Sequence, residues 1–354
     1  MPTKSPSAFQ AGGSNQGNTP PVKARPAVAV FVILGGLIAL AFSLALSIAV
    51  GAANVSLATV WDAVFDYNPE LQEHLIVHEL RMPRALAGAL TGACFAVAGA
   101  LMQGMTRNPL ADSGLLGLNS GAALALALCF AFAPGMPFML IIVWCFVGAG
   151  VAAGIVYGIG SLSRGGLTPV RLVLAGAAVS ALFTALSEGI AIYYRIGQEL
   201  AFWYAGGLAG TKWVQLDAIL PWTAAALIGA MMMSRSITML SLGEEVASGL
   251  GLNIGRTRVL ALILVLVLAG TAVSAVGAVA FVGLLIPHVA RYLVGVDYRY
   301  IIPASAVLGA LLIVLGDIAS RMIAPPFESP IGALIALIGV PFFLYLARRE
   351  RREL

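Results

Sequence analysis

The stretch AVAVFVILGGLIALAFSLALSIAV, residues 27–50, contains no charged side chain. About 20 apolar residues in a helix are enough to cross the hydrocarbon core of a bilayer. The stretch is also longer than the apolar core of a secretory signal peptide, which spans roughly 7–15 residues. Residues 27–50 therefore predict a retained transmembrane helix.

The composition of the whole chain extends this interpretation. Of its 354 residues, 60% are hydrophobic and only 10% are charged, and the mean hydropathy is +0.96. A soluble protein carries roughly 25% charged residues because its surface faces water. The composition excludes a water-soluble protein and indicates an integral membrane protein.

Nine further apolar runs follow the first. We expect an all-α polytopic fold of about ten transmembrane helices, near residues 27–50, 83–105, 114–133, 138–161, 168–193, 214–235, 257–277, 279–296, 303–323 and 331–347. The runs are continuous and do not alternate, which argues against a β-barrel. The seventh and eighth runs form one long apolar stretch, interrupted only near Gly277 and Pro287.

The basic residues set the expected orientation. With the N-terminus inside, fifteen Lys and Arg fall on the cytoplasmic side, and five fall outside: Arg81, Arg84, Arg195, Lys212 and Arg321. An excess of basic residues marks cytoplasmic loops. We therefore predict a multi-pass membrane protein with both termini inside. Its parts are a disordered tail (1–26), a transmembrane domain (27–347) and a basic C-terminus (348–354).

A shared spacing suggests an internal repeat. Gly99-Ala100 precedes Pro109 by the same interval by which Gly277-Ala278 precedes Pro287. In the expected topology these stretches run in opposite directions, which is typical of an inverted repeat. We predict such a repeat between spans 2–5 and spans 7–10.

The sequence lacks the parts of an enzyme. None of its three lysines follows a glycine-rich loop, so no Walker A motif binds nucleotide here. The histidines are not clustered, and the cysteines lie in apolar runs without a C-x-x-C pair. We therefore expect no catalytic residues, no metal site, no cofactor bound by this chain and no nucleic-acid partner. Ionisable residues are scarce within the spans, which argues against proton coupling and towards an external energy source.

Three arginines break the charge bias at the outer side. Arg81 and Arg84 flank the start of span 2, and Arg321 lies at the outer end of span 9. Guanidinium groups match carboxylates in bidentate geometry, so these residues are candidates for docking an acidic partner. The alternative is that they reach out to lipid headgroups.

A proline-containing loop follows span 2 on the inner side. Pro109 has no backbone N–H, and it biases Asn108 away from helical conformation. Irregular backbone at membrane depth is tolerated only beside protein or a water-filled cavity. Asn108, Pro109 and Leu110 therefore form either a tight turn or a pore-lining gate.

The inner segment 241–258 reads SLGEEVASGLGLNIGRTR. It predicts a short amphipathic helix over residues 244–250, a stop at Gly251 and a second short helix beginning near Asn253, both outside the bilayer. Glycines at several positions permit close approach. We interpret the segment as a docking surface for a cytoplasmic partner.

Several ordered motifs then resemble one family. The chain resembles the permease subunits of type II ABC importers for iron–siderophore complexes, haem and cobalamin, from about residue 27 to its end. The resemblance rests on RMPRALAGALTGA (81–93), GALMQGMTRNPLADSGLLGLNSGA (99–122), LGEEVASGLGL (242–252), VGLLIPHVAR (282–291) and FESPIGALIALIGVPFF (327–343).

The resemblance implies a location in the bacterial cytoplasmic membrane, together with a set of partners and roles. Two permeases, alike or related, would surround one pathway and work with two ATPase subunits, which bind ATP and Mg²⁺, and with an extracytoplasmic substrate-binding protein. Arg81, Arg84 and Arg321 would meet glutamates of the binding protein, and Asn108, Pro109 and Leu110 would form the cytoplasmic gate. The ATPase coupling residues would be Gly243, Glu244, Glu245, Ala247, Gly249 and Gly251.

The substrate implied by the resemblance is a ferric siderophore. Residues 190–213 and the C-terminal stretch look most like siderophore permeases, with haem as the first alternative and cobalamin as the second. From another class, the alternative function is an ion-coupled secondary transporter, which would transport without an ATPase or a binding protein.

Overall fold

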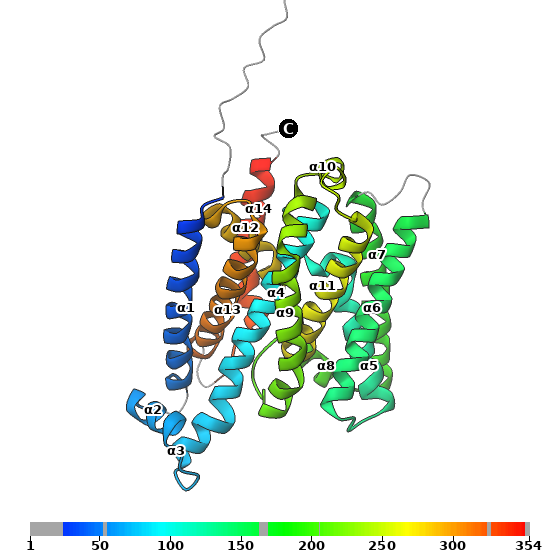
Figure 1. Cartoon of the computed structure of the whole chain (residues 1–354). Helices are drawn as coiled ribbons and strands as arrows, with labels where there is room; N and C mark the ends of the chain where they lie inside the picture. Colours follow the sequence, from blue (N-terminus) through cyan, green and yellow to red (C-terminus); the bar gives the residue numbers. More distant parts are fainter. Residues whose placement is uncertain (1–23, 52–54, 163–168, 205, 324–326, 351–354) are drawn as a thin grey trace, which may run out of the picture.

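The computed structural model describes residues 24–51, 55–162, 169–204, 206–323 and 327–350. Its long helices run side by side in one bundle (Figure 1). Most of the tail predicted at 1–26, and the last residues of the basic C-terminus, lie outside these ranges. The all-α fold predicted from the sequence is confirmed.

Ten helices correspond in order to the ten predicted spans. They are α1 (Pro26–Ala49), α4 (Met82–Thr106), α5 (Leu118–Phe132), α6 (Phe138–Leu162), α7 (Pro169–Tyr194), α9 (Trp213–Ser241), α11 (Ile254–Val276), α12 (Val282–Val294), α13 (Tyr298–Met322) and α14 (Ile331–Glu350). Within the described residues, seven helical stretches are long and apolar enough to cross a membrane, and three further apolar helices are shorter. The helix α1 lies at the edge of the bundle, and only 11% of its apolar window is buried. Lipid would cover the rest.

Short elements mark the two ends of the bundle (Figure 1). We call one end the α2 face, after α2 (Leu57–Phe65), which lies there with α3 (Gln72–Leu75) and α8 (Gly197–Tyr204). A π-helical turn (Ile76–Arg81) joins α3 to α4. The opposite end is the α10 face, after α10 (Glu244–Gly249), and the described chain begins and ends there.

Several span boundaries differ from the predicted ones by up to six residues, and two of the differences change how an element begins. The third span starts later than residue 114, because Ser113–Leu116 form a 3₁₀ turn and Gly117, with φ 71°, separates this turn from α5. The second short helix expected near Asn253 is not separate. Asn253 caps α11 by accepting a hydrogen bond from the Arg256 N–H at 3.0 Å, and α11 then continues without a break as the seventh span.

The helix α4 lies at the centre of the bundle, because small residues let its neighbours approach closely. Gly92 lies against Gly309 of α13, and Gly99 lies against Gly283 of α12. A β-carbon at Gly92 or Gly99 would overlap the carbonyl group of its partner. Such glycine contacts are a common way of packing helices in lipid, where burial of apolar surface does not drive association.

A proline in α12 leaves a carbonyl group that α4 satisfies. Pro287 has no N–H to donate to the carbonyl of Gly283, four residues earlier. The Nε2 group of Gln103 on α4 donates to this carbonyl at 3.2 Å and to that of Leu284 at 3.3 Å. Gln103 is 2% exposed, so its amide fixes α12 to α4 within the bundle.

The order of helix lengths agrees with the predicted inverted repeat. In α4–α7 the second helix is short, with 15 residues, and in α11–α14 the second helix is again short, with 13. The shared glycine–proline spacing, however, does not mark equivalent positions in the two halves of the repeat. Pro109 lies in the loop after α4, whereas Pro287 lies inside α12.

Candidate functional site

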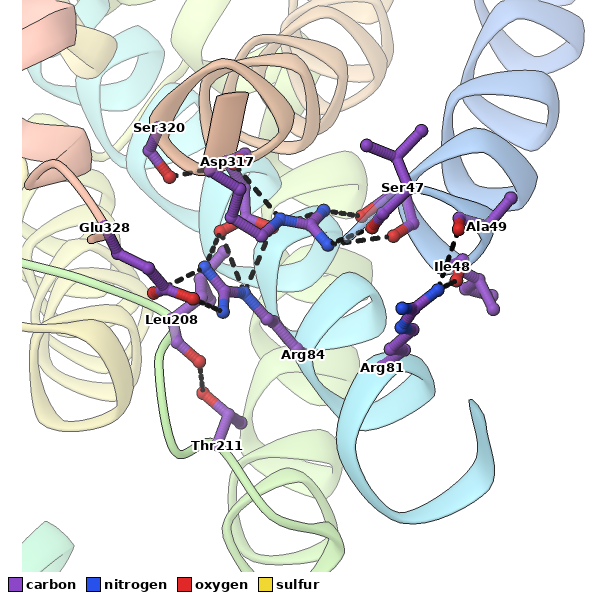
Figure 2. Close-up of polar contacts among 12 residues, drawn as sticks. Ser47, Ile48, Ala49, Arg81, Arg84, Leu208, Thr211, Asp317, Ser320 and Glu328 are labelled. Atoms are coloured by element: carbon purple, nitrogen blue, oxygen red, sulfur yellow. Dashed lines mark hydrogen bonds and ion pairs between the residues drawn. The ribbon is translucent and has the colours of Figure 1, made fainter. Parts of the chain in front are cut away.

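Four charged side chains meet near the α2 face, around the start of α4 (Figure 2). Arg84 of α4 donates from Nη2 to Oδ1 of Asp317 on α13 at 2.7 Å and from Nε at 3.0 Å. The same guanidinium donates to both carboxylate oxygens of Glu328, at 2.7 and 3.0 Å. Arg84 is therefore held between two carboxylates.

Arg321 completes this cluster from one turn beyond Asp317. Its Nη2 lies 3.0 Å from Oδ2 of Asp317. Its Nη1 donates to the carbonyls of Ser47 and Val50, at 3.0 and 2.7 Å, at the end of α1. The side chain of Asp317 is 1% exposed, so this carboxylate joins two arginines away from solvent.

Arg81 lies apart from the carboxylates. Its Nη1 donates to the carbonyls of Ile48 and Ala49, both at 2.7 Å (Figure 2). The last carbonyls of a helix have no partner within the helix, and positive charge there is favourable. Arg81 and Arg321 therefore cap the C-terminus of α1, and the buried Arg81 is 7% exposed.

These contacts bear on the predicted docking role. All three arginines bond within the chain, and the side chains of Arg84 and Arg321 are 12% and 9% exposed. The most accessible member of the cluster is Glu328, whose side chain is 40% exposed. Neither Glu328 nor Asp317 was among the predicted site residues. The i,i+4 spacing of Asp317 and Arg321 was the available signal.

The predicted gate loop lies at the other end of α4, towards the α10 face. Asn108 accepts a hydrogen bond from the Leu110 N–H at its Oδ1, at 2.9 Å, and its carbonyl accepts from the Ala111 N–H at 3.1 Å. Asp112 then begins the next turn by accepting from the Ser113 N–H at 2.8 Å. Residues 108–111 therefore form a tight, half-buried turn, which is the conformation that Asn before Pro favours.

The predicted coupling segment protrudes on the α10 face. The helix α10 is only six residues long, and it is attached through Ala247, which is fully buried. Gly243 precedes it, Gly249 is its last residue and Gly251 follows it. Gly243 and Gly251 have φ values of 122° and 82°, which favour glycine. Glu244 and Glu245 form its first turn.

Glu244 forms ion pairs with residues of two other elements. Its Oε1 accepts from Nη2 of Arg258 on α11 at 2.6 Å and lies 3.6 Å from Nη2 of Arg107 at the end of α4. Glu245 is exposed. The structure thus brings the predicted coupling segment and the residue before the gate loop into contact, which the sequence analysis did not foresee.

A second polar junction on the α10 face joins α9 to α13. Asp297 precedes α13 and accepts from the Arg299 N–H at 2.9 Å, from Nη2 of Arg299 at 2.6 Å and from the hydroxyl of Thr238 at 3.2 Å. Burial by itself raises the pKa of Asp297, but the hydrogen bonds and charge of Arg299 outweigh it and hold the pKa below its usual range.

Comparison with known proteins agrees with this architecture. Residues 38–349 match the FecCD transport family. The chain is 53% identical over 326 residues to the iron(3+)-hydroxamate import system permease protein FhuB of Bacillus subtilis, covering 92% of this chain and 85% of that protein. It is 40% identical over 329 residues to the Fe(3+)-citrate import system permease protein YfmD of Bacillus subtilis, covering 93% and 98%.

A solved structure has the same fold. It is an inward-facing conformation of a metal-chelate type ABC transporter, with a TM-score of 0.78 and 26% sequence identity. The match covers 90% of this chain and 99% of that one. The arrangement of helices around α4 is therefore shared with a known transporter.

Proposed function

The chain belongs to the FecCD transport family, and from this membership we propose that it carries a ferric siderophore inward as the permease of an ATP-driven importer. The observation that supports this most strongly is the 53% identity, over 92% of this chain, to a permease whose name specifies iron(3+)-hydroxamate. A hydroxamate siderophore is therefore the proposed substrate.

The partners follow from the composition of such importers. A second permease, either a copy or a relative of this chain, completes the pathway. The sequence of this permease contains no Walker A motif, so binding of ATP and Mg²⁺ is assigned to two separate ATPase subunits. A substrate-binding protein delivers the iron complex from outside.

We assign the two faces accordingly. The α10 face is cytoplasmic, so both termini are inside, and α10 with its flanking glycines contacts the ATPase. The α2 face receives the binding protein. There the docking role falls on Arg84, since Arg81 and Arg321 are committed to α1. A carboxylate of the binding protein would replace Glu328, the exposed and therefore exchangeable partner of Arg84.

Transport then takes five steps. The loaded binding protein docks on the α2 face, and the substrate enters between the two permeases. ATP binding moves the ATPase subunits and, with them, α10. The turn at Asn108–Leu110 opens, and the substrate leaves on the cytoplasmic side.

The test is uptake in proteoliposomes that contain this chain, its ATPase and its binding protein. Iron-labelled ferric hydroxamate is supplied outside, with ATP or a non-hydrolysable analogue inside. We expect uptake only with ATP and all partners, and competition by unlabelled ferric hydroxamate but not by haem. Uptake without ATPase or binding protein would contradict the proposal and indicate a secondary transporter. Competition by haem alone would show that the proposed substrate, a ferric hydroxamate, is wrong.

A further inference from the structure

Arg107 has a backbone conformation that an arginine rarely adopts. It ends α4 with φ 53° and ψ 32°, in the left-handed region. Glycine is the usual residue where a helix ends in this way, since a β-carbon disfavours the conformation. The chain contains 40 glycines, yet this position is an arginine. The side chain of Arg107 therefore has a use that outweighs the backbone strain.

The contact of that side chain is α10. Nη2 of Arg107 lies 3.6 Å from Oε1 of Glu244, the first residue of α10. A β-carbon at Gly243 would lie 3.8 Å from Nη1, so the guanidinium lies over the turn that leads into α10. Arg258 of α11 holds the same carboxylate at 2.6 Å. Glu244 thus connects the ends of three elements.

The next residue after Arg107 is the first residue of the gate turn. A displacement of Arg107 therefore acts on Asn108 and Pro109 through the backbone. The other end of the turn is anchored, because the carboxylate of Asp112 lies against the backbone of Gly283 at the start of α12. The turn is held between α10 on one side and α12 on the other.

We infer that Arg107 is a positioning residue that transmits the movement of α10 to the gate turn through its ion pair with Glu244. The inference rests on the proposed function, in which α10 contacts the ATPase. The pair suits a switch because both side chains are about half exposed, 48% and 43%. Water can solvate either charge when the pair breaks, so the two states differ little in free energy.

The alternative is that Arg107 is only a helix cap. Substitution by glycine separates the two roles, because Arg107→Gly removes the side chain and relieves the backbone strain. A capping role predicts unchanged or higher thermal stability and normal transport. The transmitting role predicts the same stability but a roughly two- to five-fold lower ratio of iron taken up to ATP hydrolysed, the range expected for one exposed ion pair.

Arg195 provides a matched control. It follows α7 with a positive φ of 59°, it is exposed, and it lies two residues before the start of α8. Arg195→Gly makes the same chemical change and relieves the same strain away from α10. We expect wild-type stability from this variant and, with the binding protein at saturating concentration, a wild-type ratio of iron taken up to ATP hydrolysed.

A charge exchange tests the pair itself. In an Arg258→Gln background, which removes the second cation beside residue 244, Arg107→Glu and Glu244→Arg should each lower the ratio. The two changes together should restore it to within about two-fold of that background. Combining Arg107→Glu with Glu245→Arg, one residue further along α10, should not restore it. Copurification of the ATPase with each variant establishes that the complex still assembles.

The measurement is made in proteoliposomes with all partners, where uptake and ATP hydrolysis are followed together. A wild-type ratio in Arg107→Gly, or no rescue by the exchange in assembled complexes, would overturn the inference. Absence of ATP-driven uptake by the wild type would instead overturn the proposed function, so the two failures are distinguishable.

Discussion

Replacement of Asp317 by asparagine should destabilise the protein more than any other single change in the arginine cluster. The carboxylate is 1% exposed and lies between Arg84 and Arg321, at 2.7 and 3.0 Å. Asp317→Asn leaves the two guanidinium groups with Glu328 as their only carboxylate in the cluster that the structure describes. Removal of one partner from a buried ion pair costs about 3–5 kcal/mol.

This magnitude converts into a measurable shift of the melting temperature. In large domains one kcal/mol corresponds to about 2 °C, so we expect Asp317→Asn to melt roughly 6–10 °C below the wild type. The assay is thermal unfolding of the purified protein in detergent, followed by tryptophan fluorescence. Glu328→Gln is the matched control. Its side chain is 40% exposed, and an exposed pair contributes about 0–1 kcal/mol, so its shift should stay below about 2 °C.

A compensating variant tests the cause. Asp317→Asn combined with Arg321→Gln removes both charges of one pair and leaves Arg84 with Glu328. Replacing both partners costs less than leaving one buried and unpaired, so the double variant should recover part of the loss. Equal melting temperatures for Asp317→Asn and Glu328→Gln would refute the conclusion that Asp317 is the buried centre of the cluster.

Three further predictions concern docking, packing and pH. Glu328→Gln should raise the affinity for the substrate-binding protein several-fold, because it frees the outer side of Arg84, whereas the double variant Arg84→Gln, Glu328→Gln should lower this affinity. The affinity is measured by titrating the binding protein onto the reconstituted permease. Equal affinities of the two variants would argue against docking at Arg84. Gly99→Ala should lower the stability of the protein by about 1–3 kcal/mol, because the new β-carbon overlaps the carbonyl of Gly283. Gly154→Ala on α6 is the control: there is open space at that position, so this variant should be neutral or slightly stabilising in the same melting assay. The folded-state pKa of Asp297 is below its usual value of about 3.9. Its contribution to stability is therefore complete above that pH and is lost as the pH falls through the folded pKa. The melting temperatures of wild type and Asp297→Asn should differ at pH 7 and converge on acidification; a constant difference would contradict this reasoning.

The membrane-spanning fold was accessible to sequence analysis because the bilayer acts on each segment separately. Each span must satisfy its own backbone hydrogen bonds and present apolar side chains to lipid. The uninterrupted apolar runs therefore located the ten helices that correspond to spans in the described part of the chain, including the break near Gly277. The short helices α2 and α8 carry no such constraint, and the analysis did not predict them.

The candidate sites could be predicted from the sequence only in part. The arginines stood out because they break the charge bias, and the gate turn stood out because of Pro109. Residues that act through a partner gave weaker signals. Arg107 looked like one more basic residue of a cytoplasmic loop, and its left-handed backbone and its contact with Glu244 are properties of the folded chain.

The sequence by itself determined that this chain crosses a membrane about ten times and belongs with importer permeases, because hydropathy and local motifs are read along the chain. Only the tertiary structure decided which charges pair. Arg84 and Asp317 are 233 positions apart, and Gln103 reaches a carbonyl 180 positions away. A buried charge or a carbonyl freed by proline must find its partner in space, and the packing of glycines in α4 sets which groups come within reach.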